Sequence, residues 1–166
     1  PNLKEETTSK MEHSIGVPMQ IIEKIEDVNV KNNFLESIKI LEKNGFKTKQ
    51  IELPFLEYSL PSYYVIAPAE CSANLSRYDG IKFGYRCDNP KDLEDLYVRT
   101  RSEGFGEEVK KRILIGTYCL SAGYFDAYYI KAQKIRAMIT ESFKNAFKDV
   151  SVIAMPTCSN GAFDLG

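Results

Sequence analysis

One arginine lies on an otherwise apolar side of a helix that the sequence predicts from Glu107 to about Ala122. The helix begins with two acidic residues, which complement its dipole. At 100° per residue, the side that carries Arg112 also carries Val109, Ile113, Gly116, Leu120 and Gly123. A half-buried guanidinium group in such a place can hold a carboxylate with two hydrogen bonds. It can equally pair with an acidic residue of the same protein, and the spacing alone leaves both interpretations open.

Glycine recurs on the same side of this helix, at Gly116 and Gly123. A glycine inside a helix costs about 1 kcal/mol relative to alanine, so its position calls for a structural reason. The sequence therefore predicts either close packing of another element against this side or a pocket beside Arg112.

Polar side chains recur at helical spacing in a second predicted helix, from about Leu60 to Arg77. They share one face with an alanine, and the face comprises Tyr63, Ala67, Glu70, Asn74 and Arg77. This face is either turned to solvent or forms an internal polar network that reaches a ligand. Tyr63 is the main candidate because tyrosine often lies where an apolar environment meets a polar group.

No catalytic nucleophile can be assigned from the sequence. There is no G-x-S-x-G elbow and no phosphate-binding glycine loop. His13, the only histidine, starts a predicted strand and is interpreted as a surface residue rather than a general base. None of the four cysteines forms a C-x-x-C pair, so neither a zinc site nor a disulfide framework is predicted. We expect them to be small buried or half-buried hydrophobic residues: Cys71, Cys87, Cys119 and Cys158.

The composition excludes several classes of protein. Hydrophobic residues make up 43% and charged residues 27% of the chain, as in soluble globular proteins. No apolar run approaches the roughly 20 residues of a membrane helix, and the first ten residues do not resemble a signal peptide. The 22 basic and 23 acidic residues give a formal net charge of −1, which argues against binding a polyanion unaided. A cytoplasmic protein, or one of an organellar matrix, fits best.

The order of predicted elements indicates an α/β fold. A strand at His13–Val17 is followed by a helix at about Val28–Asn44, which Gly45 caps in the left-handed conformation. A second strand follows at Phe46–Leu53. A strand, helix and strand of these lengths form a βαβ unit, whose two strands are parallel.

Three further elements are predicted in the second half of the chain. A short helix capped by Asp92 runs to about Ser102. A long helix spans about Phe125–Lys148, with an inner stripe of Tyr128, Ala132, Ile135, Ile139, Phe143 and Ala146. The apolar run Val150–Met155 predicts a fully buried central parallel strand. Such a strand needs neighbours on both sides, so we expect the sequence to be part of a larger domain.

Two long motifs resemble the amidase subunit (the A subunit) of the tRNA-dependent amidotransferase that acts on glutamyl-tRNA(Gln). The first runs from Tyr63 to Gly80 and the second from Thr100 to Ile113. The resemblance covers almost the whole chain, and it continues through Gly116–Tyr118, Ser121–Tyr129 and Lys131–Lys134. It implies the amidase-signature fold, a mixed β-sheet wrapped by α-helices. Residues 1–166 are then a single partial domain that lacks the upstream catalytic region and the downstream end.

The resemblance also implies an activity. The family hydrolyses glutamine with a Ser–cis-Ser–Lys triad, which is expected upstream of Pro1, so the segment alone is predicted to be inactive. The released ammonia passes to a partner subunit that uses ATP and magnesium to convert Glu-tRNA(Gln) to Gln-tRNA(Gln). The expected partners are subunits B and C, and the first of these is expected to bind most of the tRNA. No cofactor, metal or membrane contact is expected of this segment itself.

Two substrate contacts of the family match positions in this chain. The arginine that pairs with the α-carboxylate of glutamine matches Arg112, and a tyrosine that lines the glutamine pocket matches Tyr63. The family aspartate that helps to hold the amino group of glutamine falls beyond Gly166. A departure occurs at Cys158–Gly161, where the family usually has a Thr- and Pro-rich run. The alternatives are a stand-alone amidase acting on a small amide and a non-catalytic module that binds a partner protein.

Overall fold

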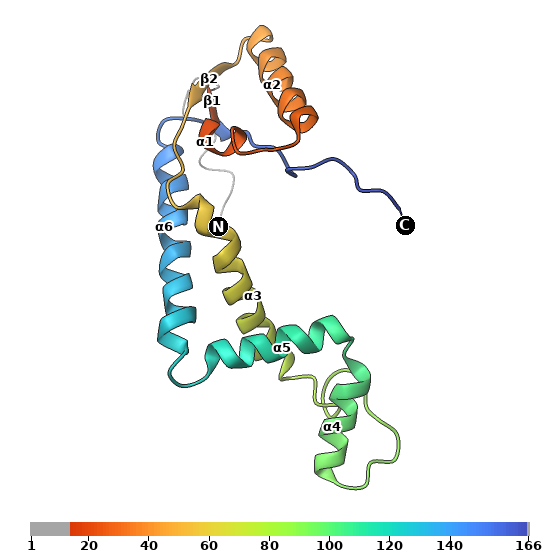
Figure 1. Cartoon of the computed structure of the whole chain (residues 1–166). Coiled ribbons are helices and arrows are strands. Elements are labelled where there is room, and N and C mark those ends of the chain that lie inside the picture. Colours follow the sequence, from red (N-terminus) through yellow and green to blue (C-terminus); the bar gives the residue numbers. More distant parts are fainter. Residues whose placement is uncertain (1–13, 166) are drawn as a thin grey trace. The chain divides into compact units, whose positions relative to one another are not determined.

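A computed structural model describes residues 14–165 of the chain, which divide into two compact units. The second unit is Glu57–Met138, and the first comprises the described residues on either side of it. The labels of Figure 1 are used for the helices and strands of both units. The α/β class predicted from the sequence is confirmed, since helices accompany a small parallel sheet.

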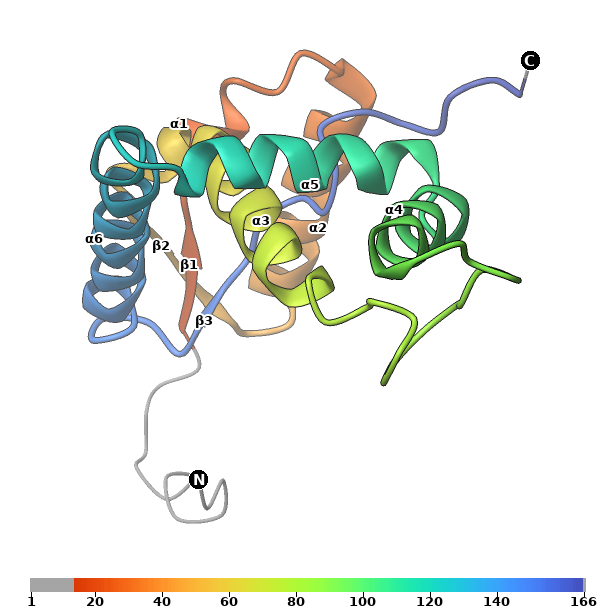
Figure 2. The ribbon, with the colours of Figure 1, turned by 90° about the horizontal axis from the view of Figure 1, so that it is seen from below.

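The sheet of the first unit contains three strands in the order β2-β1-β3. They are β1 (Ser14–Val17), β2 (Lys47–Gln50) and β3 (Val152–Ile153), and β1 lies between the other two in Figure 2. Both pairings are parallel, and Ile15 lies opposite Thr48 on one side and Val152 on the other. The predicted βαβ unit is therefore confirmed.

The connection between β1 and β2 contains two helices, α1 (Met19–Ile22) and α2 (Val28–Lys43). Asp27 caps α2, because its carboxylate accepts hydrogen bonds from the backbone N–H groups of Asn29 and Val30. Gly45 follows the end of α2 with φ of 91°, the left-handed conformation that the sequence predicts there. Both ends of α2 are therefore set by nearby residues that can be identified from the sequence.

Apolar side chains cover both faces of this sheet. Ile15 and Val17 of β1 pack with the apolar stripe of α2, including Ile38. Gly16, which points to the opposite face, lies against Ile51 and Val150. A Cβ atom at Gly16 would come within 2.9 Å of both side chains. Burial on both faces explains why β1 is a continuous apolar run rather than an alternating one.

The last strand differs from its prediction. The sequence predicts a fully buried central strand at Val150–Met155, but β3 contains two residues and lies at an edge of the described sheet. Val152 is 52% exposed, whereas Val150, which precedes the strand by two residues, is buried. Val150 is buried against Ala146, near the end of α6, and against Gly16 on one face of the sheet, but it precedes β3 and is not a strand residue.

Acid should weaken the first unit through Asp27. Hydrogen bonds from the backbone N–H groups of Val30, Gly161 and Asn29 lower the pKa of its carboxyl below the ordinary 3.8. The folded state therefore favours the carboxylate, and this contribution is complete above pH 3.8 and is lost as the pH falls through the lower folded value. We expect Asp27→Asn, which keeps an acceptor oxygen, to reduce the fall in melting temperature between about pH 5 and pH 2. An identical pH dependence in the two proteins would contradict this expectation.

The second unit is helical. It contains α3 (Ser59–Leu75), α4 (Leu93–Gly104) and α5 (Glu107–Leu120), and a short 3-10 turn, η1 (Leu56–Tyr58), precedes α3. Figures 1 and 2 both show α5 crossing α3. Asp92 caps α4 by accepting a hydrogen bond from the N–H of Asp95, as the sequence predicts. The predicted ends of these helices agree with the structure to within about two residues.

The long final helix begins with a π-helical segment, where the sequence predicts a regular α-helix. Residues Phe125–Ile130 form a π-helix, η2, and α6 (Lys131–Ala146) continues from it. The predicted inner stripe holds at Ala132 and Ala146, which are buried, but Tyr128 is 45% exposed. A π-helix advances by more residues per turn than an α-helix. A stripe projected backwards at 3.6 residues per turn therefore loses its register within η2.

The loop of residues 76–92 is fastened to α4 by side chains of that helix. Arg101 donates hydrogen bonds to the carbonyl oxygens of Leu75 and Tyr78, at 2.9 and 3.1 Å. The Thr100 hydroxyl accepts a hydrogen bond from the N–H of Cys87 at 3.2 Å, and both residues are buried. The loop lacks helices and strands, yet its backbone polar groups are engaged at several points.

Thr100→Val should loosen this attachment. Valine keeps the shape of threonine but has no acceptor, so the buried Cys87 N–H loses its partner at a cost of about 1–3 kcal/mol. We expect that loss in the free energy of unfolding, together with faster hydrogen exchange at the Cys87 amide. Thr157→Val is the matched control, because Thr157 is exposed, and it should change neither quantity. Unchanged exchange at Cys87 would show that the hydroxyl does not hold the loop.

The four cysteines are free thiols in the structure. Cys87 and Cys119 are buried and Cys71 is partly buried, as predicted from the sequence. Burial raises the pKa of the Cys119 thiol, since a thiolate is poorly solvated there. Cys158 is exposed, so the expectation of burial is wrong for that residue. It lies in the segment after β3, and residues 154–165 form neither helix nor strand.

Candidate functional site

The site is built on the crossing of α3 and α5 in the second unit. At the crossing, Gly116 of α5 lies against the backbone of α3 at Pro68. A Cβ atom at Gly116 would lie 1.9 Å from the Pro68 carbonyl oxygen and 2.7 Å from the Cβ of Ser72. Of the two explanations that the sequence left open for this glycine, the structure therefore supports close packing. The Ser72 and Thr117 hydroxyls share a hydrogen bond of 2.9 Å across the same crossing.

Arg112 lies one turn before Gly116 on α5 and makes contacts with both helices. Its Nε donates to the Glu108 carboxylate at 3.0 Å, and its Nη1 donates to the Tyr63 hydroxyl of α3 at 3.3 Å. The side chain is 36% exposed, which agrees with the half-buried position predicted for it. The hydrogen bond to Tyr63, together with the nearby Glu108 carboxylate, raises the pKa of Arg112 above its ordinary value. Arg112 is therefore positively charged at every physiological pH.

The structure brings together Arg112 and Tyr63, the two candidate residues, which are 49 positions apart in the sequence. The structure also contains the alternative contact, a pair between Arg112 and an acidic residue of the same protein. That residue is Glu108, which lies one turn earlier in the same helix. An exposed pair with this spacing contributes little to stability. The pair with Glu108 lies within α5 and uses Nε, so it is separate from the contact that Nη1 makes with Tyr63 of α3.

Hydrogen-bond donors remain available at this pair. Among residues 14–165, the Nη2 group of Arg112 has no hydrogen-bond partner. The Tyr63 hydroxyl accepts from Arg112, so its own proton is free to be donated. Carboxylates accept several hydrogen bonds and bind well to a guanidinium group beside a hydroxyl. The pair can thus hold a carboxylate without breaking the contact between the helices.

The rest of the predicted polar face of α3 lies mostly at the surface. Glu70 accepts a hydrogen bond of 2.7 Å from the Tyr129 hydroxyl of η2, which raises the pKa of that hydroxyl. Arg77 donates to Asn74 on its own helix at 3.4 Å. This face is exposed, as one interpretation of the sequence holds, but Tyr63 and Glu70 also reach neighbouring elements. Periodicity alone could not identify those partners.

Three tyrosine rings form a row that joins the end of α5 to η2, a feature that was not predicted from the sequence. The rings of Tyr118 and Tyr124 are 4.3 Å apart, and that of Tyr128 lies 5.9 Å from Tyr124. A hydrogen bond with Tyr124 and burial raise the pKa of Tyr118 to about 12. The concentration of tyrosine between residues 118 and 129 was the only signal in the sequence.

Other classes of site are not seen in the part of the chain that is described. Within residues 14–165, no three side chains of histidine, cysteine, aspartate or glutamate come together as metal ligands would. No helix in that range has both the length and the apolar character needed to span a bilayer. His13 lies outside the described residues.

Fold and site together describe an α/β chain in which two crossing helices present an arginine and a tyrosine suited to an anionic group. A family model described as Amidase matches residues 2–166, which is nearly the whole chain. The chain belongs to the amidase family. This finding supports the amidase-signature fold that the sequence motifs imply.

Individual relatives give a finer comparison. The A subunit of glutamyl-tRNA(Gln) amidotransferase from Hahella chejuensis is 55% identical over 153 residues, which are 92% of this chain and 32% of that protein. The corresponding protein of Ruthia magnifica is 53% identical over 152 residues, with the same shares of both chains. The crystal structure of the A subunit from Thermotoga maritima matches with a TM-score of 0.61 and 35% identity. The match covers 92% of this chain and 28% of that protein. This chain spans about a third of the length of such relatives.

Proposed function

We propose that this chain is the glutamine-binding part of the amidase subunit of a tRNA-dependent amidotransferase. The complete enzyme would hydrolyse glutamine and supply the ammonia that converts Glu-tRNA(Gln) to Gln-tRNA(Gln). The observation that carries the proposal is the contact between Arg112 and Tyr63, because it joins the two residues that the resemblance assigns to glutamine. Identity of 53–55% to the A subunits of this enzyme from several bacteria supports it.

Arg112 and Tyr63 would recognise the end of glutamine that does not react. Arg112 would hold one carboxylate oxygen through Nη1 and Nη2, and the Tyr63 hydroxyl would donate to the other. Fixing the α-carboxylate would place the side-chain amide at a constant distance from the nucleophile. The nucleophile and its partners, a Ser–cis-Ser–Lys triad, would be supplied by other parts of the enzyme. The chain alone would then bind glutamine without hydrolysing it.

The proposal extends to the assembly. Residues 1–166 would form part of one larger amidase domain, which would associate with subunits B and C. ATP and magnesium would be used by the partner subunit, which would also bind most of the tRNA. The complex would act in the cytoplasm or in an organellar matrix. No cofactor would be held by this chain.

A transfer experiment tests the function. The complete amidase subunit would be purified with its partner subunits and supplied with Glu-tRNA(Gln), ATP, magnesium and glutamine carrying 15N in its side-chain amide. We expect the label to appear in Gln-tRNA(Gln), and only when all the subunits are present. Equal hydrolysis of glutamine when the partner subunits are left out, with no label in tRNA, would indicate a stand-alone amidase. Absence of hydrolysis under every condition would indicate a module that only binds a partner.

A further inference from the structure

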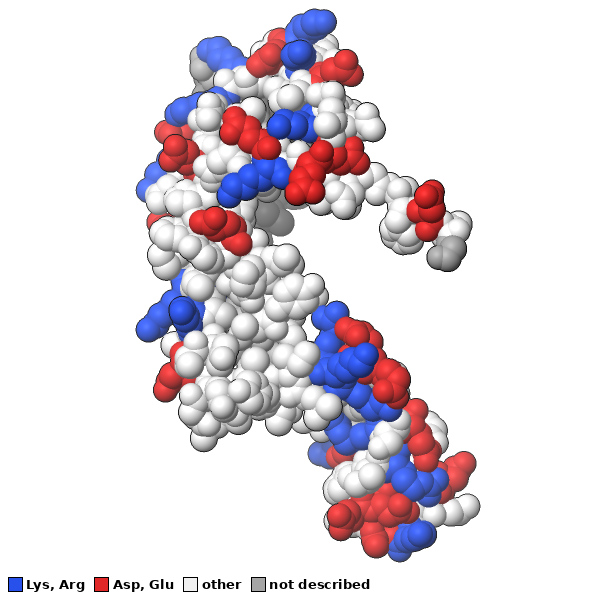
Figure 3. Space-filling model, in the orientation of Figure 1, with Lys and Arg blue, Asp and Glu red and all other residues white. Residues whose placement is uncertain are grey.

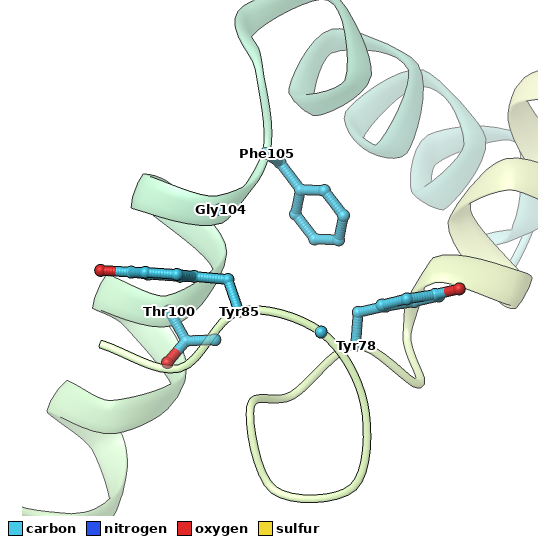
Figure 4. Close-up of a pocket in the computed structure, with 6 residues that line it drawn as sticks. Tyr78, Tyr85, Thr100, Gly104 and Phe105 are labelled. Atoms are coloured by element: carbon cyan, nitrogen blue, oxygen red, sulfur yellow. The ribbon is translucent and has the colours of Figure 1, made fainter. Parts of the chain in front are cut away.

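Two adjoining hollows lie where the loop of residues 76–92 meets α4 in the second unit. The first has a volume of about 260 Å³, and we call it the aromatic pocket (Figure 4). It is lined by Tyr78, Gly84, Tyr85, Thr100, Gly104 and Phe105. The second, of about 270 Å³, shares Tyr78 and adds Arg77 and Phe83. Neither hollow includes Arg112 or Tyr63, so they are separate from the proposed glutamine contacts.

The aromatic pocket depends on glycines at two points. A Cβ atom at Gly84 would lie 2.8 Å from Cδ1 of Tyr78, and one at Gly104 would lie 3.2 Å from Cδ1 of Tyr85. Gly84 also has a backbone φ of 81°, which residues other than glycine rarely adopt. The glycines leave room for the rings, and the hydrogen bonds of Arg101 to the loop backbone hold Tyr78 in place. A surface ordered in this way loses little conformational freedom when it binds a ligand.

The size and exposure of these hollows indicate a protein ligand. Cofactors and other small molecules usually occupy cavities of about 300–1,000 Å³ that enclose most of their surface. The aromatic pocket is smaller and open to solvent, and it suits one apolar side chain. Tyr78, Phe83 and Tyr85 are each between 44% and 56% exposed. Rigid aromatic side chains that are exposed in the free protein often contribute most of the affinity at protein interfaces.

Two arginines beside the hollows have no acidic partner among residues 14–165. Arg77 donates only to the Asn74 side chain, and Arg101 donates to backbone carbonyls while its guanidinium group lies 5.0 Å from the centre of the Phe105 ring. Neither forms a salt bridge within residues 14–165, whereas the neighbouring Arg99 pairs with Glu103 at 3.0 Å. An apolar pocket flanked by two such cations is complementary to an apolar side chain next to carboxylates.

The charge of the surrounding segment argues against a nucleic acid. Residues 76–104 contain six basic and six acidic residues and therefore carry no net charge. Figure 3 shows Lys and Arg intermingled with Asp and Glu over the part of the surface that contains α4. Binding of RNA or DNA depends on a basic excess that neutralises phosphates, and this segment has none.

We infer that the two hollows form a docking site for a partner protein, through a segment in which an apolar side chain is flanked by carboxylates. The apolar side chain enters the aromatic pocket, and the carboxylates pair with Arg77 and Arg101. This inference goes beyond the proposed function, and it holds whether or not Arg112 contacts glutamine.

An NMR titration of the 15N-labelled chain with model peptides tests the site. The first peptide has a leucine flanked by glutamates, the second has alanine in place of the leucine, and the third has lysines in place of the glutamates. We expect the first peptide to shift the amides of Gly84 and Phe105, and the second to bind about ten-fold more weakly because it buries less apolar surface. The third should bind more weakly by a similar factor at low salt, and added salt should reduce the difference.

Variants locate the binding. Arg77→Glu and Phe83→Ala should each weaken the first peptide, whereas the matched changes Lys91→Glu and Val98→Ala, at exposed positions outside both hollows, should not. Arg77→Glu should also bind the lysine peptide better than the unchanged chain does, a gain that an unfolded variant could not show. Equal binding of the first and second peptides, or no binding of the first, would overturn the inference. So would tighter binding of a short single-stranded RNA than of the first peptide at the same amides.

Discussion

Gly116→Ala should lower the free energy of unfolding of this chain by about 1–3 kcal/mol, because overpacking at a tight contact forces the backbone to move. The new methyl group would lie 1.9 Å from the carbonyl oxygen of Pro68 and 2.5 Å from its carbonyl carbon. Both are backbone atoms of α3, so no side-chain rotation relieves the clash. The higher helix propensity of alanine returns only about 1 kcal/mol. Denaturation by urea, followed by circular dichroism, measures the loss.

Gly106→Ala is the control for this substitution. Gly106 precedes α5 with φ of −65°, and a Cβ atom there would meet nothing within 4 Å. We expect a loss below about 1 kcal/mol, which reflects the weaker capping by alanine. Equal effects of the two substitutions would mean that α3 and α5 do not pack closely at Gly116. Because the crossing also sets the distance from Arg112 to Tyr63, Gly116→Ala should impair glutamine use by the complete enzyme as well.

Arg112→Ala should lower kcat/KM for glutamine by between about thirty-fold and several thousand-fold, the usual effect of removing one partner of a hydrogen-bonded charge pair at a binding site. The loss follows from removing the guanidinium donors that would bind the α-carboxylate. Arg112→Lys should recover only a part of the activity, because an ammonium group lacks the planar pair of donors. The assay is ammonia release from glutamine by the complete enzyme.

Two further variants separate substrate binding from general damage. Lys111→Ala removes a neighbouring cation that is exposed on α5, and it should leave kcat/KM within about two-fold, as surface substitutions usually do. Tyr63→Phe removes a hydroxyl and keeps the ring, and we expect a loss of about three- to ten-fold. An unchanged kcat/KM for Arg112→Ala would remove Arg112 from the glutamine site and would favour its role as the partner of Glu108.

Local signals made most of the fold predictable. The helix that becomes α2 has an apolar stripe, an aspartate at its start and Gly45 at its end, so its bounds follow from propensity and capping. The two strands around it are parallel because a crossover helix connects them. Prediction failed where a global arrangement overrides such signals. The π-helix η2 changes the number of residues per turn, so Tyr128 does not lie on its predicted stripe. Val150 is buried against Ala146 outside the strand, and its apolar character was interpreted as part of a buried strand.

The candidate site was predictable in its residues but not in its geometry. Helical spacing placed Arg112 on the glycine-bearing side of α5 and Tyr63 on a polar face of α3. Nothing in the spacing could show that these faces meet, because the meeting depends on how closely Gly116 approaches Pro68. The hydrogen bonds from Arg101 to the loop backbone could not be predicted either. Every residue has a backbone carbonyl, so the sequence does not show which carbonyls accept from Arg101.

The central claim, that Arg112 binds the α-carboxylate, is tested most directly by changing that carboxylate. The complete enzyme would be assayed with glutamine and with its α-amide, in which the carboxylate is replaced by a neutral carboxamide. We expect the unchanged enzyme to prefer glutamine by about a hundred-fold or more, since a site that pairs with a charged group rejects the analogue that lacks it. In Arg112→Ala, kcat/KM for glutamine divided by kcat/KM for the α-amide should fall to within about ten-fold of unity. The variant lacks the guanidinium group that would distinguish the carboxylate from the carboxamide. A ratio that stays the same in Arg112→Ala would contradict the claim.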